Sequence, residues 1–128
     1  MEILIDFDST CVIHKYPGSG PDIKGAVEVL KELVDCGNNL ILFTMRAKED
    51  NGLQEAVSWF RERNIKLYGI QSNPTQESWT SSPKAYGHLI IDDLCLGIPL
   101  IYNPAISDRS FVDWKGVREL LVARGIIR

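Results

Sequence analysis

Short apolar runs alternate with amphipathic segments along most of the chain, and this alternation restricts the possible folds more than any other feature. The apolar runs cover residues 2–7, 39–44, 65–70, 88–92 and 100–102. Apolar residues recur at helical spacing in the segments between and after them. Strands that alternate with helices are typical of a mostly parallel sheet with helices on its faces. The sequence therefore predicts an α/β protein with a three-layer αβα, Rossmann-like fold.

Three helices are expected, and each has residues suited to begin and to end it. These residues are Pro21 and Gly37 for the first helix, Asp50 or Asn51 and Asn64 for the second, and Asp113 and Gly125 for the third. The chain has 128 residues, which is close to the commonest size of one domain. We therefore expect residues 1–128 to form a single domain.

Composition and charge exclude several classes of protein. The net charge is −3 and no Lys/Arg-rich block is present, so stable binding to nucleic acid is not expected. No apolar run approaches the roughly 20 residues of a membrane span, and residues 1–8 lack the basic start of a signal peptide. The three cysteines are scattered and odd in number, which favours a reducing, cytoplasmic setting over a disulfide framework.

Acidic residues follow two of the apolar runs directly. Asp6 and Asp8 lie at the end of the first run, and Asp92 and Asp93 lie at the end of the fourth. In a parallel sheet the carboxyl ends of the strands share one edge, where ligands bind. Four carboxylates at one edge repel each other unless a cation lies between them. Hard oxygen ligands without nearby His or Cys favour Mg²⁺.

This arrangement suits phosphoryl transfer. One carboxylate of the DFDST segment can attack phosphorus and form an aspartyl-phosphate. The other can protonate the leaving oxygen and then deprotonate the attacking water. The simpler interpretation is that acidic residues at strand ends cap helices or lie in solvated loops. Two acidic pairs, each placed directly after an apolar run, favour the functional interpretation.

The chain resembles the haloacid dehalogenase (HAD) superfamily of phosphotransferases. The resemblance lies in four motifs that occur in the family's order. They are IDFDST at 5–10, ILFT at 41–44, Lys84, and LIIDD at 89–93. The first motif is quite specific, the last is moderately so, and the single Thr and Lys are weak signals. Together the motifs span nearly all of the catalytic core.

The resemblance implies a role for each matching residue. Asp6 would be the nucleophile and a Mg²⁺ ligand. Asp8 would be the general acid and base, with its backbone carbonyl on the metal. Thr44 would hydrogen-bond the transferring phosphoryl group, and Lys84 would neutralise charge on Asp6 and the phosphate. The acidic pair after the fourth run completes the site: Asp92 would bind Mg²⁺, and Asp93 would support it directly or through water.

Two departures from the family pattern are visible. Ser9 occupies a position where the family usually has Gly, which affects the backbone of the turn that follows Asp8. Lys84 lies only eight residues before Asp92, so Lys66 is the alternative site lysine. Residues 9–20 have room only for a flap, and no cap domain fits between 45 and 83. The resemblance is therefore to a capless enzyme with an open crevice.

The expected substrate is a phosphomonoester, such as a sugar phosphate, a nucleotide or a phosphorylated macromolecule. Ser9, Thr10 and Arg46 are expected to bind it, because Arg46 follows Thr44 closely and its guanidinium can fork onto a phosphate. An open crevice also makes a homodimer attractive. The alternative is a non-catalytic phosphate- or metal-binding module on the same fold, such as a signalling receiver. A hydrolase needs a second carboxylate at Asp8, whereas a binder does not.

Overall fold

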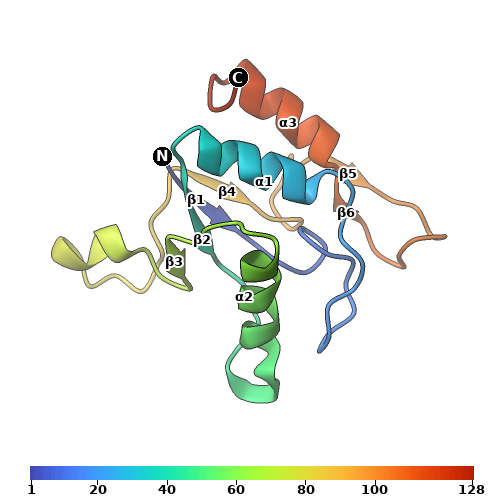
Figure 1. The fold of residues 1–128 in the computed structure, drawn as a ribbon, viewed down its shortest axis with the longest axis horizontal. Helices are drawn as coiled ribbons and strands as arrows, with labels where there is room; N and C mark the ends of the chain where they lie inside the picture. The colour runs from blue at the N-terminus through green and yellow to red at the C-terminus, as the bar shows by residue number, and fades with distance from the viewer.

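Four parallel strands form the central sheet, in the order β3-β2-β1-β4. The structure is a computed structural model and describes residues 1–128. In chain order its elements are β1 (Glu2–Ile5), α1 (Ala26–Asp35), β2 (Asn39–Leu42), the 3₁₀ helix η1 (Glu49–Asn51), α2 (Gly52–Glu62), β3 (Gly69–Ile70), the 3₁₀ helix η2 (Pro74–Ser78), β4 (Leu89–Ile91), β5 (Leu100–Ile101), β6 (Phe111–Val112) and α3 (Trp114–Ala123). The predicted α/β class with a mostly parallel sheet is confirmed (Figure 1).

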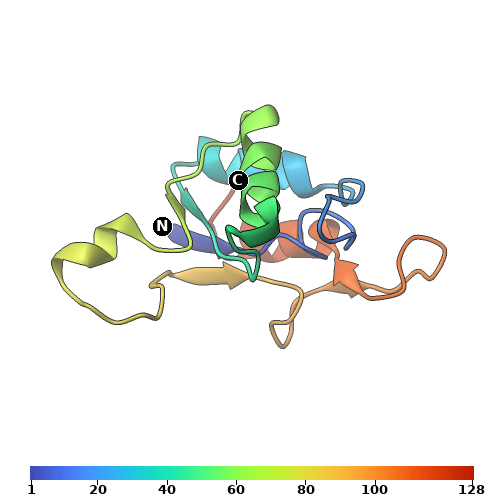
Figure 2. The ribbon, with the colours of Figure 1, turned by 90° about the horizontal axis from the view of Figure 1, so that it is seen from below.

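The two faces of the sheet are covered differently. Alternate residues such as Ile3 and Ile5 point to the face that packs into one large core with apolar residues of α1, α2 and α3. On the other face Leu4 and Ile41 pack with Ala85 from the segment that contains η2. The two faces are therefore unequal, because all three helices contribute to the large core and the other face carries only this small cluster. The 3₁₀ helix η2 extends to one side of the sheet (Figure 2).

The flap, residues 9–20, folds back on the segment that precedes α1. The amide of Ile13 donates to the carbonyl of Pro21, and the amide of Ile23 donates to the carbonyl of Cys11. This pairing keeps the segment extended, so the prediction that α1 begins at Pro21 is wrong and the helix begins at Ala26. Position 20 requires glycine because the chain passes close to Ile13 there: a Cβ at Gly20 would lie 2.1 Å from the Ile13 carbonyl oxygen.

The expected fifth strand at 100–102 does not join the parallel sheet. β5 instead pairs antiparallel with β6, and the two form a separate hairpin whose loop spans residues 102–110. The hairpin and the flap lie on the side of the molecule toward which the arrowheads of β1 and β4 point (Figures 1 and 2). This is the edge of the sheet where the acidic residues lie. Asp113 then caps α3 by accepting from the amide of Gly116, as predicted.

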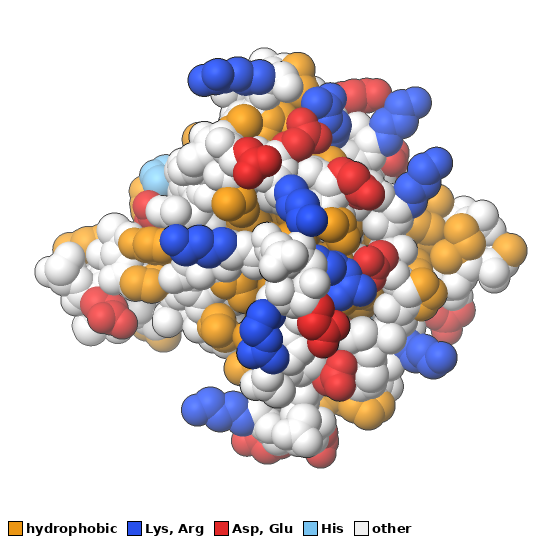
Figure 3. All heavy atoms as spheres, in the orientation of Figure 1, with side chains coloured by type: hydrophobic (Ala, Val, Ile, Leu, Met, Phe, Trp, Pro, Cys, Tyr) orange, Lys and Arg blue, Asp and Glu red, His pale blue; other side chains and the backbone are white.

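The surface shows mixed charge. Lys and Arg side chains are interspersed with Asp and Glu over the face seen in Figure 3, and no large patch of one sign is visible there. Apolar side chains gather over the β5–β6 hairpin, where Tyr102 is 65% exposed and Ile106 is 55% exposed. None of the helices has the length and apolar character that crossing a membrane requires.

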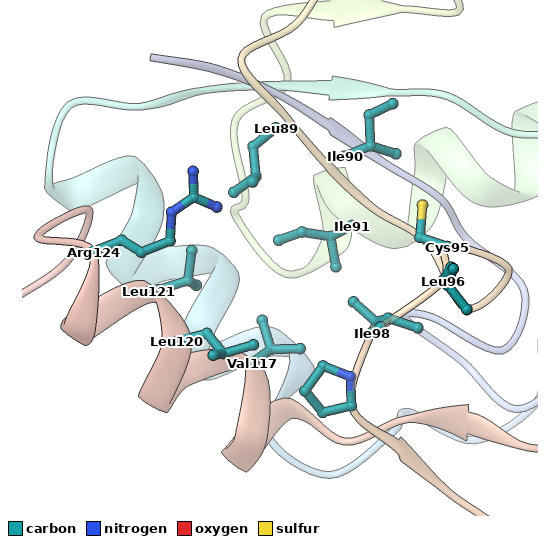
Figure 4. A pocket seen from close by; sticks show the side chains of 12 residues that line it. Leu89, Ile90, Ile91, Cys95, Leu96, Ile98, Val117, Leu120, Leu121 and Arg124 are labelled. Carbon is teal, nitrogen blue, oxygen red and sulfur yellow. The ribbon is translucent and has the colours of Figure 1, made fainter.

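An apolar groove of about 230 Å³ lies between the outer edge of β4 and α3 (Figure 4). Leu89 and Ile91 of β4 face Val117 and Leu121 of α3 across it, and Arg124 reaches in from the end of α3. No carboxylate lines this groove. Its composition therefore does not support cation binding, and the chemistry-bearing residues lie elsewhere.

Candidate functional site

Three carboxylates meet where β1 and β4 end. The ligand oxygens of Asp6, Asp92 and Asp93 all lie within 4.8 Å of one another. Asp6 directly follows β1, the acidic pair directly follows β4, and the two strands are parallel neighbours. The prediction that these residues gather at one edge of the sheet is confirmed. We refer to them as the carboxylate cluster.

The carboxylate cluster carries uncompensated negative charge. Burial, followed by the charge of Asp92, raises the pKa of Asp6 from 3.8 to about 8, although the hydrogen bond from Thr10 opposes this shift. Burial also raises the pKa of Asp93. Such shifts arise when like charges crowd together in a partly desolvated place. A divalent cation would remove the repulsion, and three carboxylates without a His or Cys ligand fit a hard cation such as Mg²⁺.

Thr10 holds the cluster in place. Its hydroxyl donates to Asp6 Oδ2 at 2.8 Å and accepts from the Asp93 amide at 3.2 Å. Its carbonyl accepts from Nε1 of Trp114 at 2.6 Å, and the residue is fully buried. The prediction that Thr10 binds substrate is therefore wrong. A side chain that is buried and hydrogen-bonded on both sides positions Asp6 and does not reach a substrate.

Asp8 lines the cavity beside Asp6 and Asp93 but is not part of the carboxylate cluster, because it pairs with Arg46. Both of its oxygens accept hydrogen bonds from Arg46, at 2.7 Å from Nε and 2.8 Å from Nη2. The same guanidinium donates to the carbonyls of Pro17 and Gly18 in the flap and of Gly52 in α2. Of the four carboxylates expected around one cation, three form the cluster, and the fourth, Asp8, pairs with Arg46. The metal contact implied for its backbone carbonyl stays a prediction.

Arg46 has a structural role here and not the substrate-binding role predicted for it. Its side chain is only 1% exposed, and its guanidinium lies over the rings of Phe7 and Tyr16. All of its strong hydrogen bonds go to the protein itself. The expectation that Arg46 forks onto a substrate phosphate is therefore wrong, because the fork is already occupied by Asp8.

Thr44 lies at the site, on the turn that follows β2. Gln71 fixes this turn by accepting from the Thr44 amide at 2.9 Å and donating to the carbonyls of Thr44 and Arg46. The Thr44 hydroxyl accepts from the Arg46 amide at 3.2 Å. Its implied contact with a phosphoryl group stays a prediction. The sequence pattern gave no signal for Gln71, because its role depends on contacts with residues 25 to 27 positions away.

Neither predicted lysine reaches the site. Lys84 lies on the amino side of β4, and its carbonyl accepts from Nε2 of Gln76 at 2.8 Å. Its side chain lines a different pocket, together with Trp79 and Tyr86. Lys66 lines pockets beside α2 and the start of β2. The assignment of Lys84, and of Lys66 as its alternative, is wrong in this structure because both precede their strands and lie toward the opposite edge of the sheet.

A cavity of about 350 Å³, the site cavity, opens beside the carboxylate cluster. Its lining combines the predicted catalytic and binding residues with five further residues. The predicted ones are Asp6, Asp8, Ser9, Thr44, Arg46 and Asp93, and the others are His14, Tyr16, Met45, Leu94 and Arg109. Met45 and Leu94 are 97% and 86% exposed, so the lining of this mostly polar cavity includes two apolar side chains open to solvent.

Ser9 lines the site cavity, although its side chain is almost fully buried. Its φ is +61°, in the left-handed region that favours glycine. Its amide donates to the Val12 carbonyl, and its carbonyl accepts from the Val112 amide of β6. The expectation that Ser9 binds substrate stays a prediction for its hydroxyl. The backbone conformation accounts for the glycine that the HAD pattern has at this position.

The fold and the carboxylate cluster define a small α/β protein with a candidate cation site at the carboxyl edge of a parallel sheet. No family model and no curated protein matches the chain. Among solved structures, the conserved protein coded by a locus of Bacteroides thetaiotaomicron is 34% identical, with a TM-score of 0.77. The match covers 97% of this chain and 91% of that one. The chain belongs to the same family as that protein, and its function has to be argued from the site.

Proposed function

We propose that the protein is a Mg²⁺-dependent phosphohydrolase of the HAD superfamily that transfers the phosphoryl group of a phosphomonoester to Asp6. The observation that carries this proposal is the carboxylate cluster beside an open cavity. One carboxylate oxygen of each of Asp6, Asp92 and Asp93 lies within 4.8 Å of the other two, a spacing that one cation could bridge. The order of the DFDST, ILFT and LIIDD motifs supports the same assignment.

The reaction divides into two displacements at phosphorus. In the first, a carboxylate oxygen of Asp6 attacks phosphorus, the bond to the leaving oxygen breaks, and Asp8 gives that oxygen a proton. In the second, Asp8 takes a proton from water, and the water oxygen attacks phosphorus. The bond between phosphorus and Asp6 then breaks, which releases inorganic phosphate and restores the carboxylate. Each Asp8 oxygen keeps a lone pair for the proton beside its hydrogen bond to Arg46.

Asp6, Asp92 and Asp93 are the residues that would hold Mg²⁺. When bound, the cation supplies positive charge that offsets the charge of the cluster and of the phosphoryl oxygens. Thr10 keeps the Asp6 carboxylate oriented, and Gln71 keeps the Thr44 turn in place beside it. These contacts belong to the folded chain, so the site is organised before substrate binds.

Turnover of p-nitrophenyl phosphate tests the proposal. We expect Mg²⁺-dependent hydrolysis that falls at least about 100-fold in Asp6→Asn, a size typical of losing a key catalytic group. Asp35→Asn, an exposed carboxylate at the end of α1, is the matched control and should keep wild-type activity. Equal turnover in the wild type and Asp6→Asn would reject Asp6 as the nucleophile.

The Asp8–Arg46 ion pair favours a second candidate, a non-catalytic phosphate- or metal-binding module. In such a protein Asp8 would serve only to hold Arg46 and the flap. Asp8→Asn separates the two functions, because it should abolish turnover in a hydrolase while leaving phosphate binding in place. A wild-type protein that binds phosphate with Mg²⁺ and never hydrolyses any of a panel of phosphomonoesters would favour the binder.

The substrate class stays a sugar phosphate, a nucleotide or a phosphorylated macromolecule. The exposed Met45 and Leu94 on the cavity lining favour a leaving group with an apolar face. We propose a cytoplasmic location from the scattered, odd-numbered cysteines. A homodimer is proposed as well, and sedimentation analysis tests it. No stable complex with nucleic acid or membrane is proposed.

A further inference from the structure

The proposed phosphate site still lacks a positively charged side chain that could contact the phosphate. Four carboxylates lie at it, and the one guanidinium fully built into it, that of Arg46, pairs with Asp8. Even with a divalent ion bound, a phosphate group would approach a surface of net negative charge. Phosphoryl groups in protein sites are usually met by a Lys or Arg in addition to a metal ion. The residues implied for this role, Lys84 and its alternative Lys66, lie in other pockets.

Arg46 cannot supply that charge in this arrangement. Four of its contacts are 2.8 Å or shorter, and they go to both oxygens of Asp8 and to two flap carbonyls. Releasing the guanidinium to a substrate would leave a mostly buried carboxylate unpaired and would open the flap. Arg46 therefore stabilises the flap and Asp8 and is not free to bind a substrate.

Arg109 also lines the site cavity. It lies in the loop of the β5–β6 hairpin, and its side chain is 53% exposed. Its closest ionic partner is the exposed Asp108 at 3.8 Å, too far for a strong hydrogen bond. An arginine with free donors at the mouth of an acidic cavity has the geometry to grip a phosphate through two parallel hydrogen bonds.

The hairpin that carries Arg109 is tied to the loop of the nucleophile. The Val112 amide of β6 donates to the carbonyl of Ser9 at 3.0 Å, and the Asp113 amide donates to the Pro99 carbonyl at 2.8 Å. Trp114, which follows, donates to the Thr10 carbonyl. The chain from 112 to 114 thus fixes the base of the hairpin against the DFDST segment, so Arg109 approaches the site from a defined side.

We propose that Arg109 is the substrate-binding cation of this site and that it binds the phosphoryl oxygens of the substrate. The role rests on the proposed phosphohydrolase function, and it assigns to a hairpin residue the positive charge that the HAD resemblance places at Lys84. Arg109 makes its contact with the phosphate and not with the metal, so its loss should weaken anion binding while leaving Mg²⁺ binding unchanged.

Binding of inorganic phosphate to the Mg²⁺-loaded wild-type protein, measured by isothermal titration calorimetry, tests the proposal without any turnover. We expect Arg109→Ala to weaken phosphate binding by about 10- to 100-fold, the size of a lost charged hydrogen-bond pair. Arg109→Lys should recover part of the affinity. The control is Arg61→Ala, an exposed arginine on α2 outside the site cavity, which should bind phosphate as the wild type does.

The outcomes separate this proposal from the proposed function. Phosphate binding in Arg109→Ala equal to that of the wild type would overturn the role of Arg109 alone. A wild type that binds Mg²⁺ but no phosphate would overturn the phosphate site itself, and both proposals with it. Equal melting temperatures and equal Mg²⁺ affinities in Arg109→Ala and the wild type would establish that a loss of phosphate binding does not come from unfolding or from loss of the metal.

Discussion

Arg46 grips Asp8 through both carboxylate oxygens and at the same time holds the flap through the carbonyls of Pro17 and Gly18. Asp8 follows β1, Arg46 follows β2, and the flap begins at Ser9, directly after Asp8. One buried guanidinium therefore joins the turn of the proposed nucleophile, the neighbouring strand and the covering loop. The stability of the flap and the orientation of Asp8 depend on the same contact.

Replacing Arg46 should destabilise the whole domain. Arg46→Ala leaves Asp8 and two flap carbonyls without their donor, and losing one partner of a buried ion pair costs about 3–5 kcal/mol. Urea unfolding should show a loss near that size, and limited proteolysis should cut the flap sooner. Arg61→Ala should change stability by less than about 0.5 kcal/mol. A stability of Arg46→Ala close to that of the wild type would contradict a structural role for the ion pair.

The metal-free protein should lose stability as pH rises. The pKa of Asp6 is about 8 in the folded protein and near 3.8 when unfolded, so the folded state binds the extra proton between these values. Stability is then fully present below about pH 4 and is lost as pH rises through 8. Saturating Mg²⁺ should remove most of this slope. Urea unfolding at several pH values, with EDTA or with Mg²⁺, measures it.

Asp6→Asn provides the control for that pH dependence. The amide has no titrating proton, so the slope between pH 4 and 8 should largely disappear in the metal-free variant. Asp35→Asn should keep the wild-type slope because Asp35 lies outside the cluster. A wild-type protein whose stability is independent of pH in EDTA would show that Asp6 is not crowded by negative charge.

Thr10 should tune the cation site from a buried position. Thr10→Val keeps the shape of the side chain but removes the hydroxyl that donates to Asp6 and accepts from the Asp93 amide. Loss of such an orienting contact typically costs about 10–100-fold in metal affinity. Thr10→Ser should keep most of the affinity. Mg²⁺ titration of both variants measures the effect, and equal affinities in Val and Ser would contradict it.

Lys84 should be dispensable. Its side chain lines the pocket with Trp79 on the amino side of β4, away from the carboxylate cluster. Lys84→Ala should therefore keep aryl phosphate turnover within about twofold of wild type, whereas removing a catalytic lysine would cost about 100-fold or more. A loss of that size in Lys84→Ala would mean that the 71–87 segment moves the lysine into the site.

Some of this site could be predicted from the sequence because strand direction alone determines it. Asp6 follows one strand and Asp92 follows its parallel neighbour, so their meeting needs no knowledge of loops. Thr44 lies at the site for the same reason. The α/β class was readable from the spacing of apolar residues, since periodicity reports which face of an element is buried.

The parts that could not be predicted depend on contacts between residues far apart in the chain. Arg46 pairs with Asp8 across 38 positions, which no local pattern reveals. Lys84 lies in a segment before β4 that Gln76 holds through the carbonyls of Ser82 and Lys84, six and eight positions further along the chain. Arg109 was missed because the apolar run at 100–102 was expected in the main sheet, whereas β5 turns into a hairpin that reaches the cavity.

The central claim is that Asp6 accepts the phosphoryl group, and reductive trapping tests it directly. Borohydride added during turnover reduces an aspartyl-phosphate to homoserine, which mass spectrometry of the digested protein can locate. We predict that homoserine appears at position 6 of the wild-type protein only when substrate and Mg²⁺ are present. No homoserine should appear at position 35, the exposed control carboxylate. Turnover that proceeds with no trapped product at Asp6, or with the product at another carboxylate, would contradict the account.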